Sequence, residues 1–262
     1  VATFPASLGT GCTVCRSLPG TGADITTGVT IGATYTDNVT SYALLIYTSA
    51  QWAALDADQI ARITAWLDAK ADLKSVAVIG DSVTAAYLGY NATGVYLFGA
   101  EVTTLSVPGD TISQQKTVWL SLSSGARSAF DTVIVQIGLN DLLPEESAAT
   151  ALARLQDLID TINADNDGRL LIAQMTPCRA RLITVYGGTD GPIAYQKWLD
   201  MNEAMAGGGA APITGADAVV TAHVAALNDG SGNLAAAYSA GDWIHPNNDG
   251  KQINAKAWQT LI

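Results

Sequence analysis

Short, almost entirely apolar runs recur between residues 74 and 262, and segments with helical periodicity separate them. The first run is 75–79, and similar runs cover 102–107, 132–137 and 170–175, with a weaker one at 218–220. Runs of this kind are typical of parallel strands that other elements cover on both faces. The intervening segments with amphipathic helical spacing are 112–124, 147–163, 192–206 and 248–262.

This order of elements predicts an α/β fold. We expect a three-layer doubly wound (flavodoxin-like), mostly parallel sheet of about five strands with helices on both faces. Ligands of such sheets bind beyond the carboxyl ends of the strands. Functional residues should therefore follow the apolar runs directly.

Residues 1–48 have a different composition. They are rich in Gly and Thr, and β-branched residues alternate between the glycines. This pattern predicts a small β-rich N-terminal segment, or an ancillary module, in place of helix. The spacing over 52–68 then predicts an amphipathic helix. We therefore expect a domain boundary near residue 48, followed by a domain over 49–262 with its core in 74–262.

Charge excludes two classes of partner. The chain has 13 Lys plus Arg and 24 Asp plus Glu, so its formal net charge is −11. Nucleic-acid binding requires a basic surface that displaces counterions, and docking on an anionic membrane requires one too. No uncharged apolar run approaches the roughly 20 residues that a membrane span needs. We expect a soluble globular protein with no nucleic-acid partner and no membrane span.

No metal site and no cofactor are expected from the histidines and cysteines. The two histidines, His223 and His245, are not spaced as a pair of metal ligands, and there are three cysteines. Cys12 and Cys15 lie in turn-rich sequence, which predicts a loop with or without a local disulfide. His223 lies inside an apolar stretch and is interpreted as a structural residue.

Four short polar motifs follow the predicted strands. They are Gly80-Asp81-Ser82, Gly109-Asp110-Thr111, Gly138-Leu139-Asn140-Asp141 and Asp242-Trp243-Ile244-His245-Pro246. Any one of them is explained by an ordinary helix cap or turn. Together they place complementary chemical groups at one edge of the predicted sheet.

The chemistry of these groups fits nucleophilic catalysis. A serine hydroxyl is a poor nucleophile until a base takes its proton, and that base needs an orienting carboxylate. Ser82, which we expect at a helix N-terminus, His245 and Asp242 fill these three roles. A backbone N–H at Gly109 and the Asn140 amide can point at one position, as the donors of an oxyanion hole do.

With these motifs in this order, residues 74–262 resemble the SGNH (GDSL-type) hydrolases. The resemblance implies that Ser82 is the nucleophile, that His245 is the general base and then the general acid, and that Asp242 orients the imidazole. It further implies that the backbone N–H groups of Ser82 and Gly109 and the side chain of Asn140 hold the oxyanion.

The expected function is that of a serine esterase. We expect it to hydrolyse short-chain acyl esters, O-acetyl esters above all, through an acyl-enzyme on Ser82, with an acetylated polysaccharide or a small acyl ester as substrate. The composition suits a secreted or surface-exposed enzyme, and the N-terminal segment is compatible with a virion component. Two alternatives remain: a lipase or thioesterase-type acyl hydrolase of the same family, and a non-catalytic glycan-binding or virion module that retained the fold.

Two further features border the expected site. Residues 186–191, with three glycines, predict a flexible loop that forms a wall of the substrate pocket. Trp243 lies next to Asp242, where an aromatic side chain can meet a sugar.

Overall fold

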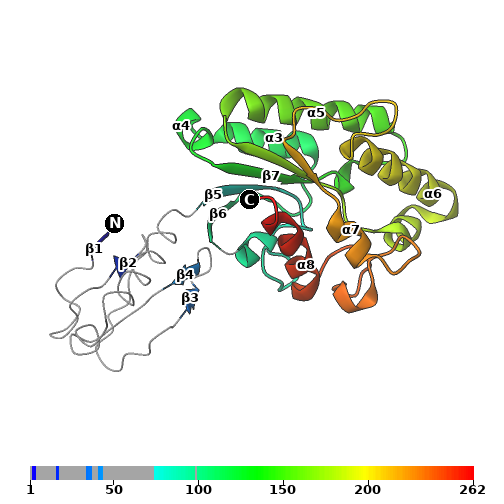
Figure 1. The fold of residues 1–262 in the computed structure, drawn as a ribbon. Coiled ribbons are helices and arrows are strands. Elements are labelled where there is room, and N and C mark those ends of the chain that lie inside the picture. Colours follow the sequence, from blue (N-terminus) through cyan, green and yellow to red (C-terminus); the bar gives the residue numbers. More distant parts are fainter. Residues whose placement is uncertain (1, 4–15, 18–33, 37–40, 44–73, 98) are drawn as a thin grey trace. The chain divides into compact units, whose positions relative to one another are not determined.

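The computed structural model describes residues 2–3, 16–17, 34–36, 41–43, 74–97 and 99–262 (Figure 1). The chain divides into two compact units, Val1–Leu73 and Lys74–Ile262. In the first unit the described residues form two antiparallel pairs, β1 (Ala2–Thr3) with β2 (Arg16–Ser17) and β3 (Thr34–Thr36) with β4 (Ser41–Ala43). The boundary near residue 48, the helix over 52–68, and Cys12 and Cys15 lie outside the described residues and stay predictions.

The second unit contains the predicted sheet. Its strands are β5 (Lys74–Gly80), β6 (Ala100–Thr104), β7 (Thr132–Gln136), β8 (Arg169–Ala173) and β9 (Ala218–Val220). All neighbours are parallel and the spatial order is β6-β5-β7-β8-β9. The chain moves from β5 outward to β6 and then returns to the other side of β5 for β7. The carboxyl ends of β5 and β7 therefore form the topological switch point at which ligands of such sheets bind.

Helices cover both faces of this sheet (Figure 1). On one face are α3 (Ile112–Ser121), α5 (Ala148–Asp165) and α6 (Arg179–Met205), and on the other is α8 (Asn248–Gln259), with α7 (Ala222–Leu227) against it. Alternation along the strands divides the core accordingly. Ile79 and Val135 pack in the cluster that contains the apolar side chains of α3, α5 and α6, whereas Val78 and Ile134 pack in the cluster with Trp258 of α8. The predicted fold class is confirmed.

The segment predicted as a flexible loop over 186–191 is helical instead, and that prediction was wrong. It belongs to α6, which departs from helical geometry at Gly187 alone, with φ 77° and ψ −174°. Gly191 is buried, and a Cβ there would lie 2.6 Å from the Cα of Ile183. One glycine thus permits a kink, and another permits the two parts of the helix to pack closely. Sequence reasoning took both for loop residues.

None of the helices in the described part of the chain is long and apolar enough to cross a membrane.

Gly191→Ala should destabilise the protein because the added methyl group would collide with the backbone of Ile183, from which it would lie 2.6 Å away. We expect a loss of about 1–3 kcal/mol in the free energy of unfolding, as for other overpacked sites. Thermal melts should show a Tm lowered by roughly 2–10 °C. Gly188→Ala is the matched control, since a Cβ at Gly188 meets nothing within 4 Å. An equal effect of the two substitutions would contradict the packing role of Gly191.

Candidate active site

The turn that carries Ser82 begins where β5 ends. The Thr84 and Ala85 N–H groups both donate to the Asp81 carbonyl, at 3.2 and 2.9 Å, which closes a single tight turn. A Cβ on Gly80 would lie 2.2 Å from Thr84 Oγ1, so only glycine fits at the end of this strand. Ser82 therefore lies on a turn that no helix continues, contrary to the expected helix N-terminus.

Three of the predicted side chains lie together in one chain of contacts. Ser82 Oγ is 2.8 Å from His245 Nε2. On the other side of the imidazole, His245 Nδ1 makes a short contact with Asp242 Oδ2. The second carboxylate oxygen, Asp242 Oδ1, accepts hydrogen bonds from the N–H groups of Ile244 and His245, at 3.2 and 3.0 Å.

These contacts keep Asp242 ionised. Partial burial alone would raise the pKa of its carboxyl, but the hydrogen bonds from the His245 ring and from the two backbone N–H groups hold that pKa below its ordinary value. A negative charge stays next to Nδ1 and fixes the orientation of the ring. Nε2 is thereby directed at the Ser82 hydroxyl.

A short loop holds Asp242 and His245 at this spacing. Ser239 and Pro246 form a bridge between its ends, and the Ala240 N–H donates to the His245 carbonyl at 2.8 Å. Within the loop, Ser239 Oγ accepts hydrogen bonds from the Gly241 and Trp243 N–H groups, both at 3.1 Å. The loop then leads into α8, whose N-cap Asn247 accepts from the Gly250 N–H at 3.0 Å.

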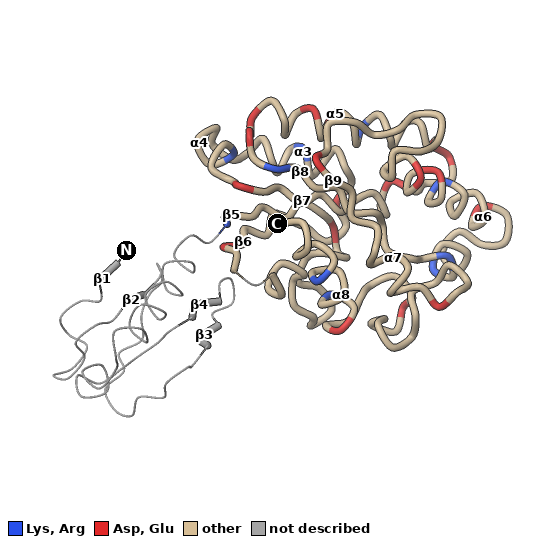
Figure 2. The backbone as a smooth tube through the Cα atoms, in the orientation of Figure 1, with Lys and Arg blue, Asp and Glu red and all other residues tan. Residues whose placement is uncertain are grey.

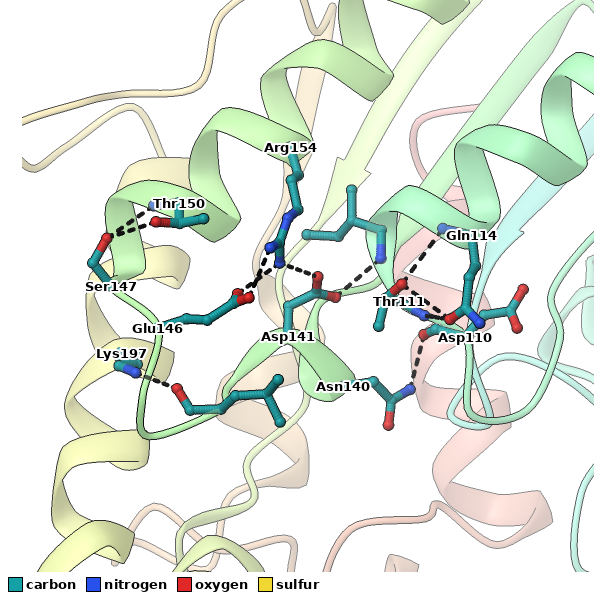
Figure 3. Close-up of polar contacts among 12 residues, drawn as sticks. Asp110, Thr111, Gln114, Asn140, Asp141, Glu146, Ser147, Thr150, Arg154 and Lys197 are labelled. Atoms are coloured by element: carbon teal, nitrogen blue, oxygen red, sulfur yellow. Dashed lines mark hydrogen bonds and ion pairs between the residues drawn. The ribbon is translucent and has the colours of Figure 1, made fainter.

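The other two predicted residues also lie side by side. Asn140 lies in the 3₁₀ turn η2 (Leu139–Asp141), which follows β7, and its Nδ2 donates to the Asp110 carbonyl at 2.9 Å (Figure 3). Gly109 precedes Asp110 and has φ 87°, a conformation that favours glycine. Because an amide nitrogen carries two hydrogens, this bond orients the Asn140 amide and leaves the second hydrogen for a ligand.

Asp141, for which no role was predicted, holds the Asn140 turn in place. Its Oδ2 accepts from the Ile112 N–H at the start of α3, at 3.0 Å, and its Oδ1 lies 3.4 Å from Arg154 of α5 (Figure 3). Arg154 also holds Glu146 through two contacts, at 2.6 and 2.8 Å. Burial raises the pKa of Asp141, while the Ile112 N–H and the Arg154 charge act in the opposite direction. The turn is therefore fixed to two helices.

Asp81 is a second buried carboxyl, directly before Ser82. It is 1% exposed, and its Oδ1 accepts from the Val83 N–H at 2.9 Å. Burial raises its pKa to about 7, against the lowering effect of the Val83 and Leu139 N–H groups. The Leu139 contact ties the Ser82 turn to the Asn140 turn. Lys251 of α8, also buried, donates to the Ala85 carbonyl, and burial lowers its pKa to about 8.

His223 lies away from this arrangement. It is fully buried, and its Nε2 contacts the Gln174 carbonyl at 2.7 Å and Gln136 Nε2 at 3.0 Å. Burial lowers the pKa of His223 to about 4, so the ring is neutral at neutral pH. This agrees with a structural residue.

Sequence reasoning missed three residues of the site. The Tyr87 ring lies against the His245 ring, with centroids 4.8 Å apart at 55°. No pattern in the sequence indicated Tyr87. Lys251 was also missed, and its only signal is a charged residue on the apolar face of a helix. Asp81 lies in the Gly80-Asp81-Ser82 motif, but its role was missed.

Asp81→Asn should remove a pH dependence of stability. In the folded chain the Asp81 pKa is about 7, against an ordinary value of 3.8. The contribution of the protonated carboxyl to stability is therefore complete below about pH 4 and is lost as the pH rises through 7. Melts at about pH 4.5, 6 and 8 should show the wild-type Tm falling relative to that of the variant. A Tm difference that stays constant would contradict the raised pKa.

Comparison with known proteins agrees with this geometry. The family model of the GDSL-like Lipase/Acylhydrolase family matches residues 78–253. That range contains all four motifs on which the resemblance was based. No curated protein matches the sequence.

Solved structures share the fold. A protein from Bacteroides fragilis described as an acylhydrolase is 17% identical, with a TM-score of 0.54 over 79% of this chain and 96% of its own. The lipase/acylhydrolase from Enterococcus faecalis is 16% identical, with a TM-score of 0.50 over 71% and 94%. A lipolytic protein of the G-D-S-L family from Desulfitobacterium hafniense is 13% identical, with a TM-score of 0.53 over 72% and 99%. The likeness to these structures concerns the fold, and the family model carries the assignment: the chain belongs to the GDSL-like lipase/acylhydrolase family and is a serine ester hydrolase.

Proposed function

We propose that this hydrolase cleaves short-chain acyl esters, above all O-acetyl esters of a carbohydrate, through an acyl-enzyme on Ser82. The observation that carries the reaction is the 2.8 Å contact between Ser82 Oγ and His245 Nε2, with Asp242 on the opposite nitrogen of the ring. A base, its orienting carboxylate and a hydroxyl in this order form the arrangement that activates a serine.

In the first half of the reaction, His245 Nε2 takes the proton of Ser82 as Oγ attacks the ester carbonyl. A tetrahedral intermediate forms, and its C–O bond to the alcohol breaks. The proton on Nε2 passes to the leaving alcohol oxygen. In the second half, water gives a proton to Nε2 and attacks the acyl carbon, and Ser82 recovers its proton as the acid leaves. Asp242 stabilises the protonated ring in both halves.

The negative charge of the intermediate needs donors that are already in place. We assign this role to the backbone N–H groups of Ser82 and Gly109 and to the Asn140 amide. Support comes from the hydrogen bond that Asn140 Nδ2 donates to the Asp110 carbonyl, at 2.9 Å. This bond links the Asn140 amide to the residue that follows Gly109. Donors held in this way cost no reorganisation when the charge develops.

The charges near the site support a neutral substrate. No Lys or Arg occurs in 75–115, 128–153 or 198–250, which contain every motif named above, and Figure 2 shows where the acidic and basic residues lie along the chain. Arg179, which follows β8, stacks over the Tyr195 ring at 5.5 Å and donates to the Ser231 carbonyl at 3.3 Å. An anionic ester would meet acidic side chains with few cations to offset them. An acetylated neutral sugar meets no such repulsion.

A polysaccharide substrate lies outside the cell. We therefore also propose that the enzyme is secreted or surface-exposed, a virion included. Fractionation of the natural source tests this location.

Ser82→Ala should abolish ester hydrolysis. Loss of the nucleophile from such a triad lowers kcat by about 10⁴-fold or more, and p-nitrophenyl acetate provides the assay. A fluorophosphonate should add once to the wild type and not to Ser82→Ala. Ser113→Ala, an exposed serine on α3, is the control and should keep both turnover and labelling. Full labelling of Ser82→Ala would overturn the assignment.

Asn140→Ala should lower turnover while it changes KM little, because the amide acts on the transition state more than on the bound ester. Loss of one oxyanion donor costs about 10²–10³ in kcat. Steady-state kinetics with p-nitrophenyl acetate measure both constants. A kcat within a few-fold of the wild-type value, with a lowered Tm, would mean that Asn140 only stabilises its turn.

A further inference from the structure

Two large apolar residues have backbone conformations that their side chains disfavour. Within the described part of the chain, Leu88 and Trp243 are the non-glycine residues with positive φ, at 52° and 66°. At positive φ the Cβ crowds the neighbouring carbonyl, so residues other than Gly, Asn and Asp rarely adopt this conformation. Both side chains are also open to solvent, Leu88 at 53% and Trp243 at 43% exposure.

Leu88 lies at the tip of a tight turn. Tyr87 and Tyr90 exchange two backbone hydrogen bonds, at 3.1 and 2.9 Å, and the residues between them, Leu88 and Gly89, both have positive φ. This is the type I′ geometry, in which Asn, Asp or Gly usually occupy the central positions. Leucine is only about half buried there in return.

Trp243 lies in the loop of the catalytic pair, between Asp242 and His245. Its N–H donates to Ser239 Oγ at 3.1 Å, and the bridge between Ser239 and Pro246 closes the loop. These contacts hold the backbone in its disfavoured conformation. The indole is nevertheless 43% exposed, so packing within the fold accounts for only part of its apolar surface.

Both residues are close in sequence to a residue that forms or contacts the same imidazole. The Tyr87 ring contacts the His245 ring at 4.8 Å, Leu88 follows Tyr87, and Trp243 precedes His245 by two residues. Strained backbone that the surroundings over-determine is concentrated at functional sites. Exposed apolar side chains gathered beside such a site indicate a ligand.

We propose that Tyr87, Leu88 and Trp243 form a platform that binds the sugar rings of the ester's alcohol part. The proposal rests on the proposed function, because it uses the direction in which His245 transfers its proton. His245 gives that proton to the leaving alcohol oxygen, so the alcohol lies on the side of the imidazole and the acyl group lies beyond Ser82. The Tyr87 ring, which contacts His245, therefore lies on the alcohol side.

The openness of the platform favours a sugar over a fatty acyl chain. Tyr87, Leu88 and Trp243 are 37%, 53% and 43% exposed, so they present a surface rather than enclose a cavity. An apolar chain needs a pocket that removes most of its surface from water. A sugar ring buries only its C–H face on an aromatic side chain, and its hydroxyls stay hydrated. The absence of Lys and Arg from 75–115, 128–153 and 198–250, the ranges that contain the four motifs, fits a neutral sugar.

The test compares two esters in two variants. Trp243→Gly and Leu88→Asn introduce residues that tolerate positive φ and remove the apolar surface. Substrates are methyl acetate, whose alcohol part is too small to cover the platform, and O-acetylated xylohexaose, whose neutral rings lack an exocyclic arm and can stack on any flat platform. We expect the ratio of kcat/KM for the oligosaccharide to kcat/KM for methyl acetate to fall about tenfold or more in Trp243→Gly. Leu88→Asn should lower the ratio less.

Controls separate this role from a structural one and from acyl recognition. Leu120→Ala removes an equally exposed leucine near the far end of α3 and should leave the ratio unchanged. The Tm of Trp243→Gly reports the balance between relieved backbone strain and lost side-chain packing, and the ratio of the two rate constants separates binding from that balance. An unchanged ratio in Trp243→Gly overturns the platform whatever its Tm. A loss on methyl octanoate as large as that on the oligosaccharide overturns it too, in favour of an acyl site.

A binding measurement distinguishes failure of the platform from failure of the proposed reaction. Unacetylated xylohexaose is titrated by calorimetry into Ser82→Ala and into the double variant Ser82→Ala/Trp243→Gly. Binding that only the single variant shows supports the platform, even if the wild type hydrolyses no ester. The platform is overturned if Ser82→Ala does not bind the oligosaccharide and the ratio is unchanged in Trp243→Gly. The proposed reaction still stands in that case if the wild type hydrolyses p-nitrophenyl acetate.

Discussion

The backbone of Gly80 joins the parts of the site, because no side chain separates it from its neighbours. Its carbonyl accepts from the Val107 N–H at 3.2 Å, and its N–H donates to Gln115 Oε1 at 3.3 Å. Gln115 Nε2 in turn donates to Asp110 Oδ2 at 2.8 Å, and the Asp110 carbonyl orients Asn140. One chain of hydrogen bonds therefore runs from the Ser82 turn to the Gly109 loop and on to the Asn140 turn. A Cβ on Gly80 would also lie 2.5 Å from the Gln136 carbonyl of β7, so any larger residue would push apart the two strands at the switch point.

Buried charge is concentrated behind this edge of the sheet, whereas the two hydrophobic clusters consist of apolar side chains. Asp81, Asp141 and Lys251 are each almost fully buried, and the pKa of each is shifted by burial toward its neutral form. Each costs free energy that apolar residues would not cost. In return, their contacts fix two turns that have little regular structure of their own, the Ser82 turn and the Asn140 turn. The stability of the fold comes from the clusters, and the geometry of the site comes from these polar contacts.

The sheet and the motif positions could be predicted because they depend on patterns of short range. Apolar runs indicate buried parallel strands, and the carboxyl ends of those strands meet at one edge wherever the helices lie. The sequence could not exclude the helix expected after Ser82. The chain instead forms a tight turn at Leu88 and Gly89, and leucine is not a residue that predicts such a turn. The prediction for Gly191 failed for a related reason. The sequence does not distinguish a glycine that permits close packing from a glycine that permits a loop. Asp81, Lys251 and Tyr87 meet residues far away in the sequence, and no local pattern encodes those contacts.

The places where local rules fail are therefore informative in themselves. Most of the described chain agrees with its sequence preferences, as expected for a foldable protein. Leu88 and Trp243 disagree in the same manner, with a disfavoured backbone and a partly exposed apolar side chain. Leu88 follows Tyr87, whose ring contacts His245, and Trp243 lies in the loop that carries His245. Asn or Gly would satisfy the backbone at either position, at the cost of the buried part of each side chain. About half of each side chain stays open to solvent, so this apolar surface is explained by what the site binds and not by packing in the fold.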